Sequence, residues 1–387
     1  MDQITPDRSH AAFDLKPLLQ SYRSIALVLQ GGGALGAYQA GVFQGLHEGG
    51  VEPNWYSGVS IGAVNAAIIA GNRPGNRVDR LRDFWETVTT RRIWNFFPDG
   101  DVFRKWQNEL SAMTTMWSGL PGFFSPRMMS PWMQFPGAGG ATSFYDTAEL
   151  EVTLNRLIDW DVLNGGDQRL SVGAVNVRTG NSRFFDTGSE VLTARHIMAS
   201  GALPPAFPAI RIENEHYWDA GVVSNTPLQY LLERDDIGDT LAFQVDLYSA
   251  RGLLPRDMAD VLGRQKDIMY SSRTRNNTDA FRQMHNLRLR LRDALGRVPA
   301  ESLTSEEQTF LTAMETVPQI NVVHLIYQQK VYESVAKDYE FSVTSMRDHW
   351  DAGYRDTCKT LRHREWLASA PGSDGMTVHD VHRDDPS

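Results

Sequence analysis

A serine framed by two glycines is the pattern in this chain with the clearest chemistry. Gly58-Val59-Ser60-Ile61-Gly62 has the spacing G-x-S-x-G, in which a serine sits on a sharp turn between a strand and a helix. Side chains at the two glycine positions would collide, because the strained turn brings its flanking residues together. The pattern predicts that Ser60 is the nucleophile of an acyl transfer reaction.

A second glycine turn lies at residues 31–36, where GGGALG also fits the spacing G-x-G-x-x-G. A dinucleotide site of this type needs an acidic residue at the end of the next strand, about 20 residues further on. The next predicted strand ends at Ser60, and Glu52 lies before that strand. The other use of backbone N–H groups at a helix N-terminus is to bind the oxyanion that forms during acyl transfer.

A serine nucleophile needs a base, and the sequence offers two kinds. Asp219 ends an alternating stretch typical of a hairpin strand and precedes a turn at Ala220-Gly221, which would point its carboxylate into a cleft. A histidine in the order Ser-Asp-His is the other kind. The candidates considered downstream of Asp219 are His285 on an arginine-rich helix, His324 inside an apolar run and His349 in a polar helix. The surroundings of each favour a structural role.

The order of four motifs resembles the patatin-like phospholipases. These motifs are GGGxxG, GVSIG, ASGALPPAFP at 199–208, and Asp219-Ala220-Gly221 followed by Asn225 and Pro227. The resemblance implies a dyad without histidine, in which Ser60 is the nucleophile and Asp219 the base. It also implies an oxyanion hole made by the backbone N–H groups of Gly31, Gly32, Gly33 and Ile61. Four further glycines belong to the motifs: Gly36, Gly58, Gly62 and Gly221.

The resemblance extends from Ser24 to about Leu247 and implies a three-layer α/β/α hydrolase core. The reaction it implies is hydrolysis of lipid acyl esters, of phospholipase A or lysophospholipase type, without metal or cofactor. This chain has Leu35 where family members often have Arg or Lys, and Ala220 where glycine is usual. The additional C-terminal residues are similar to those of a group of bacterial patatin-like proteins.

Three other functions remain open from the residues alone. An α/β-hydrolase with a Ser-His-Asp triad would require one of the three histidines. An oxidoreductase would bind a dinucleotide at the turn over 31–36. A lipid-binding protein without catalysis would bind its ligand without turnover.

Composition is typical of a globular enzyme of 387 residues, of which 41% are hydrophobic. No apolar run approaches the 18 residues of a membrane span, and the N-terminus lacks the apolar region of a signal peptide. The single cysteine, Cys358, indicates a reducing compartment. A net charge of -9 argues against nucleic acid as a partner. We therefore expect a cytoplasmic protein whose membrane contact, if any, is peripheral at the inner face; the oligomeric state is not predicted.

The chain divides into four predicted segments: an N-terminal arm (1–22), a hydrolase domain (23–250), a mostly helical C-terminal module (251–367) and a disordered tail (368–387). Residues 94–145 of the hydrolase domain hold 12 of the 39 aromatic residues and several methionines, which fits a lid over an acyl pocket or a packed helical subdomain.

In the C-terminal module, an apolar stripe from Phe281 to Leu295 is surrounded by arginines. This pattern fits a basic helix on a membrane surface or a helix packed against the core. The run 321–327 predicts an edge strand, and 343–366 predicts a long closing helix.

Overall fold

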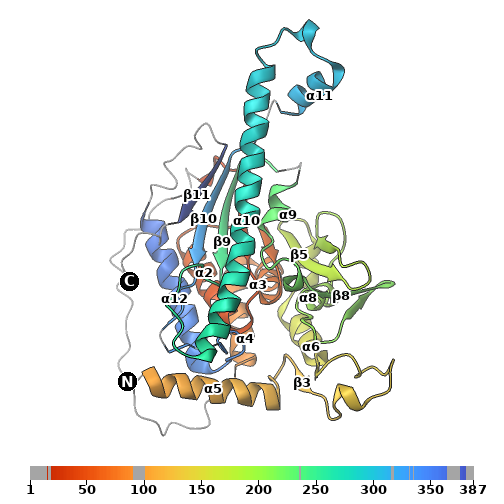
Figure 1. The fold of residues 1–387 in the computed structure, drawn as a ribbon, viewed down its shortest axis with the longest axis vertical. Coiled ribbons are helices and arrows are strands. Elements are labelled where there is room, and N and C mark those ends of the chain that lie inside the picture. The colour runs from red at the N-terminus through yellow and green to blue at the C-terminus, as the bar shows by residue number, and fades with distance from the viewer. Residues whose placement is uncertain are drawn as a thin grey trace.

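A mixed β-sheet of nine strands forms the middle layer of the part of the chain that the structure describes (Figure 1). This computed structural model describes residues 15, 19–89, 101–234, 237–314, 318–330, 332–333, 335–363 and 375–380, except for the side chains of 101–103 and 272–277. The predicted α/β class is confirmed. None of the described helices is long and apolar enough to cross a membrane.

Six strands are parallel neighbours in the order β11-β10-β9-β1-β2-β5. Their bounds are β1 (Ser24–Leu29), β2 (Trp55–Gly58), β5 (Arg169–Asn176), β9 (Thr240–Asp246), β10 (Ile320–Ile326) and β11 (Met376–Asp380). Three antiparallel strands complete the sheet: β6 (Ser182–Asp186), β7 (Ile210–Ile212) and β8 (Glu215–Asp219). A separate pair is formed by β3 (Ser125–Pro126) and β4 (Tyr145–Asp146).

Helices cover both faces of the sheet, because alternate residues of each central strand are apolar on opposite faces. In β1, Leu27 and Leu29 face one core with α2 (Gly36–Glu48), α3 (Ile61–Ala70) and α12 (Val343–Arg362). Ala26 and Val28 face the other core, with α9 (Leu228–Leu232) and α10 (Met258–Leu295). This arrangement is the three-layer α/β/α sandwich expected from the resemblance (Figure 1).

The remaining helices lie around this frame. They are α4 (Arg77–Thr87), α5 (Asp101–Ser118), α6 (Ala148–Leu157), α7 (Trp160–Asn164), α8 (Ala194–Ser200) and α11 (Ser305–Ala313). Short 3-10 helices occur at η1 (Gly33–Leu35), η2 (Pro74–Asn76), η3 (Pro131–Met133), η4 (Ala220–Val222) and η5 (Ala300–Ser302).

Strands β2 and β8 meet head to head along one edge of β5. The parallel strand β2 pairs with residues 169–172 of β5, and the antiparallel strand β8 pairs with residues 174–176. Strand β6 pairs with residues 171–175, so it overlaps both of them and must occupy the opposite edge. The end of β2, which leads to Ser60, and the end of β8, which is Asp219, therefore point at each other.

The residues beyond 250 belong to the same sheet and helix layers as the predicted hydrolase domain. Strand β10 lies between β9 and β11, so the prediction of an edge strand is wrong. Helix α12 packs closely on α2, since a Cβ on Gly353 would lie 2.0 Å from the Tyr38 carbonyl oxygen. The closing helix ends at Arg362, and residues 364–366 lie outside the described residues.

Both predicted chain ends contain ordered residues. Strand β11 corrects the prediction of a disordered tail for residues 376–380, because Met376 packs in the core beside β10. Within the predicted arm, Leu15 and Leu19 are buried in the core that α2 and α12 share. The boundaries of the four segments stay predictions.

Candidate active site

Ser60 occupies a strained turn between β2 and α3. Its φ is 58° and its ψ is -127°, a backbone conformation that costs a residue with a side chain about 1–3 kcal/mol. A Cβ on Gly58 would lie 2.4 Å from the Gly62 carbonyl oxygen, and one on Gly62 would lie 2.3 Å from the Leu29 carbonyl oxygen. These distances explain why the sequence has glycine at both positions.

Asp219 lies against Ser60 at the end of β8. The Ser60 hydroxyl donates a hydrogen bond to the Asp219 carboxylate, which also accepts one from the Gly221 N–H at 2.7 Å. Burial raises the pKa of Asp219 to about 6, although both hydrogen bonds act to lower it. Ala220 lies in the 3-10 helix η4 without a positive φ, which explains why alanine is accepted there.

The segment over 199–208, which consists of the end of α8 and the loop after it, holds the backbones of both residues. The Ser60 N–H donates to the Ser200 hydroxyl at 3.0 Å, and the Asp219 N–H donates to the Ala202 carbonyl at 3.0 Å. The motif ASGALPPAFP therefore links Ser60 to Asp219. Sequence reasoning did not assign a role to Ser200, although it lies within this motif.

The glycine turn after β1 contacts the serine, and it corrects one predicted donor. A Cβ on Gly31 would lie 3.0 Å from the Ser60 Cβ. The Gly31 N–H already donates to the Asn225 carbonyl at 3.2 Å, so Gly31 is not an oxyanion donor as predicted. Within the described part of the chain, the N–H groups of Gly32, Gly33 and Ile61 have no acceptor. These three remain candidate donors.

Asp338, far along the chain, supports this turn. Its carbonyl oxygen accepts the Ala34 N–H at 2.8 Å and would lie 2.0 Å from a Cβ on Gly33. Gly33 also has a φ of +55°, which favours glycine. The sequence carried no signal for this contact, because Asp338 belongs to none of the motifs.

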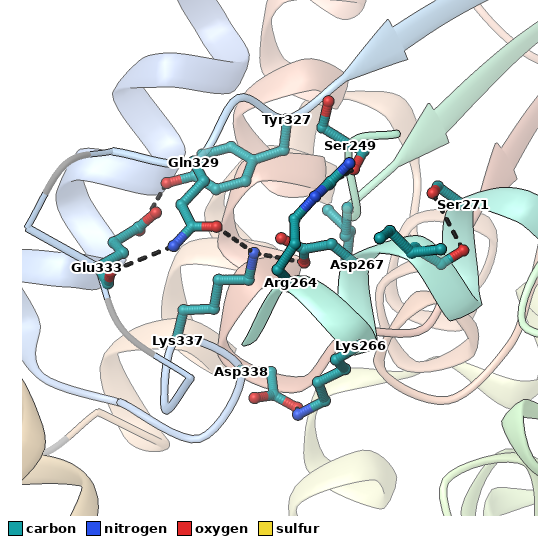
Figure 2. A network of polar contacts seen from close by, with 12 residues as sticks. Ser249, Arg264, Lys266, Asp267, Ser271, Tyr327, Gln329, Glu333, Lys337 and Asp338 are labelled. Carbon is teal, nitrogen blue, oxygen red and sulfur yellow. Dashed lines mark hydrogen bonds and ion pairs between the residues drawn. The ribbon is translucent and has the colours of Figure 1, made fainter. Parts of the chain in front are cut away.

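A polar network fastens the segment that carries Asp338 (Figure 2). The Asp338 carboxylate pairs with Lys266 of α10 at 2.5 Å, and the buried Lys337 pairs with Asp267 of α10 at 2.7 Å. Glu333 accepts hydrogen bonds from the Tyr327 hydroxyl at 2.6 Å and from His349 of α12 at 2.6 Å. The glycine turn therefore rests on a segment held by α10 and α12.

Replacing Lys337 with methionine should lower the free energy of unfolding by about 3–5 kcal/mol, because the buried Asp267 then loses its cation. Urea unfolding followed by circular dichroism measures this. The double variant Lys337→Met, Asp267→Leu should recover most of the loss, and Arg82→Met, which breaks an exposed pair with Asp79, should cost about 1 kcal/mol or less. A single variant as stable as the wild type would contradict the role of this pair.

The three candidate histidines lie elsewhere. His349 is paired with Glu333, His285 stacks on Phe281 at a ring distance of 5.7 Å, and His324 pairs through its backbone in β10. Among the described residues, no histidine is a hydrogen-bond partner of Ser60 or Asp219.

The acidic residue considered for a dinucleotide site and the apolar residue of the glycine turn both have other contacts. Glu52 lies before β2 and pairs with Arg77 at 3.0 Å and with His47 at 2.5 Å. Leu35 is fully buried in the core. The described residues contain no group of three or more His, Cys, Asp or Glu side chains that could hold a metal ion.

A strained serine beside a buried carboxylate, on a three-layer α/β/α core, has the geometry of a serine hydrolase site. A family model described as patatin-like phospholipase matches residues 27–232, more than half of the chain, and one described as "DUF3734: Patatin phospholipase" matches residues 268–373. The chain therefore belongs to the patatin-like phospholipase family, a class of lipid acyl hydrolases.

Individual relatives either match only a small part of the chain or have low sequence identity to it. Patatin-like phospholipase domain-containing protein 7 of Rattus norvegicus is 36% identical over 89 residues, which are 23% of this chain and 6% of that protein. The structure of VipD from Legionella pneumophila is 14% identical, covers 93% of this chain and 72% of its own, and has a TM-score of 0.39. Human GIVD cytosolic phospholipase A2 is 12% identical, covers 59% of this chain and 45% of its own, and has a TM-score of 0.34.

Proposed function

We propose that this chain hydrolyses acyl esters of lipids, as a phospholipase A or lysophospholipase, through a dyad of Ser60 and Asp219. The observation that carries the proposal is the hydrogen bond from the Ser60 hydroxyl to a buried carboxylate. A carboxylate with an ordinary pKa near 3.9 is a weak base for a hydroxyl. Burial, which raises the pKa of Asp219 to about 6, makes it a stronger one.

In the acylation step, Asp219 accepts the Ser60 proton while Oγ attacks the ester carbonyl carbon. The carbonyl oxygen becomes an oxyanion, which the N–H groups of Gly32, Gly33 and Ile61 would stabilise by hydrogen bonds. The tetrahedral intermediate collapses when the bond to the alcohol breaks and Asp219 returns the proton to the leaving oxygen. The product is an acyl-enzyme on Ser60.

In the deacylation step, water takes the place of the alcohol. Asp219 accepts a proton from the water, whose oxygen attacks the acyl carbon, and a second oxyanion forms in the same place. Collapse releases the fatty acid and returns the proton to Ser60. The site does not support a Ser-His-Asp triad, because His285, His324 and His349 contact other residues. It does not support a dinucleotide site either, because Glu52 is paired with Arg77.

Covalent labelling with a fluorophosphonate, followed by mass spectrometric mapping, tests the proposal. The expected result is one modified residue, Ser60, in the folded wild type, and slow labelling in Asp219→Asn. Heat-denatured protein is the control, because a serine outside an active site does not react. Modification of another serine, or none in folded protein, would show that Ser60 is not the nucleophile.

Alanine at Gly32 should lower kcat by about 10²–10³-fold and change KM less. The reason is that a tilted N–H group no longer donates its hydrogen bond to the oxyanion, which is present in the transition state and not in the bound substrate. The added Cβ would lie 2.6 Å from Cδ1 and 3.2 Å from Cβ of the buried Leu247, so either the turn or this side chain must shift. Steady-state kinetics on p-nitrophenyl esters measures this. Gly75→Ala is the matched control, since nothing lies within 4 Å of a Cβ there. Equal turnover in Gly32→Ala and wild type would remove this turn from the mechanism.

A further inference from the structure

Helix α5 exposes its apolar side and buries a polar one. Trp106, Met113 and Trp117 recur on one side of the helix and are 62%, 56% and 81% exposed. Asn108 and Thr115, on the other side, are 5% and 1% exposed. A helix that only packs on a core has the reverse arrangement. The exposed side of α5 therefore has the composition of a contact surface.

The loop after β3 adds to this exposed surface. Met128, Trp132 and Phe135 are 107%, 87% and 87% exposed. From residue 110 to residue 145 the chain has one charged side chain, Arg127, which is paired with Asp146. A stretch of 36 residues would carry about eight charges at the 22% found overall. We call the exposed apolar side chains of α5 and of residues 128–135 the apolar surface.

The apolar surface lies at the end of the molecule where the substrate would enter. Helix α5 crosses the end to which the parallel strands point (Figure 1), and Lys105 pairs there with Asp260, near the start of α10. At the far end of the segment, the N–H groups of Phe144 and Tyr145 donate to the carbonyls of Pro205 and Ala206 at 3.2 and 3.0 Å. The segment over 199–208 also holds Ser60 and Asp219.

We propose that the apolar surface docks on an electrically neutral phospholipid bilayer. Exposed patches of this kind mark an interaction site, and tryptophan is favoured at the boundary between water and lipid. The absence of charge from residues 110–145, apart from the paired Arg127, and the net charge of -9 favour a zwitterionic lipid surface over an anionic one. Docking would bring the segment over 199–208 close to the lipid.

The distal half of α10 is the rival surface. Met284, Leu287 and Leu291 are 53%, 59% and 45% exposed among arginines. A basic helix of this type would bind anionic lipid and release it at high salt. The apolar surface would bind neutral lipid, and added salt would not weaken its binding. The two surfaces therefore predict opposite dependences on lipid charge.

Co-sedimentation with phosphatidylcholine vesicles tests the proposal without any catalytic step. The wild type should bind these vesicles equally at 0.1 and 0.5 M NaCl. In the variant Trp117→Gln, Trp132→Gln, Phe135→Gln, the lipid concentration at which half of the protein is bound should rise by about tenfold or more, because three large apolar contacts are lost. The control variant Met284→Gln, Leu287→Gln, Leu291→Gln should bind like the wild type.

Three outcomes of the co-sedimentation experiment would overturn the proposal. They are no binding of the wild type to phosphatidylcholine, unchanged binding of the first variant, and binding that requires anionic lipid and disappears with salt. A lipid-free wild-type dimer in sedimentation velocity that becomes monomeric in the first variant would also overturn it, since a second copy then covers the surface. Hydrolysis of a water-soluble ester should be the same in wild type and first variant, which separates loss of docking from loss of the active site.

Discussion

Ser60→Ala should abolish ester hydrolysis and leave the protein folded. Without the hydroxyl no acyl-enzyme forms, and loss of a nucleophile lowers kcat by about 10⁴-fold or more. The fold should persist because the alanine Cβ occupies the place of the serine Cβ in the same turn. Turnover of p-nitrophenyl esters and circular dichroism of the purified variant measure both parts of this prediction.

The control for Ser60→Ala is Ser182→Ala, which changes an exposed serine at the start of β6. It should keep the activity of the wild type. Ser60→Gly should be as inactive as Ser60→Ala but more stable by about 1 kcal/mol, because glycine tolerates positive φ. A folded Ser60→Ala protein with wild-type turnover would eliminate the dyad.

Asp219→Asn should lower kcat by about 10²–10⁴-fold, the effect expected when a general base is removed. The amide keeps the shape of the carboxylate but cannot accept the Ser60 proton. Single substitutions of His285, His324 and His349 by glutamine should each keep turnover in the folded fraction. If one of these three variants is folded and inactive, a triad replaces the dyad.

The pH dependence of the wild type follows from the same group. The pKa of Asp219 is raised to about 6, so kcat/KM should rise with pH up to about 6 and then level off, because the ionised form is the base. The stability effect has the opposite sign. Between about pH 4 and 6, Asp219 is protonated in the folded state but ionised in the unfolded chain. Above pH 6 it is ionised in both, and its ionisation then lowers the free energy of unfolding by about 3 kcal/mol. Relative to Asp219→Asn, the wild type should therefore gain stability as pH falls from 7 to 4.

The parts of the site that depend on local backbone geometry were predictable. A strained turn requires glycine at positions 58 and 62, and these requirements appear in the sequence as a pattern. The three-layer core was predictable as well, through the resemblance. The proximity of Ser60 and Asp219 could be expected only from that resemblance, because nothing in the residues states that β2 and β8 share one edge of β5.

The contacts made over long separations were not predictable. Asp338 supports the glycine turn through a backbone carbonyl, which any residue type provides. The hydrogen bond from the Gly31 N–H to the Asn225 carbonyl could not be predicted for the same reason. Strand β11 was missed because its short, polar sequence gains its stability from pairing with β10.

From the shared edge of β5 we expect Ser60 and Asp219 to come together late in folding. Strand β2, which leads to Ser60, can form early, because it pairs in parallel with β1 and the two strands are close in the sequence. Asp219 arrives 159 residues later (219 minus 60) on a strand that must pair antiparallel with the same edge. Long-range pairing is slow because the intervening chain must first be closed into a loop. During refolding, helical signal should therefore return before enzymatic activity does.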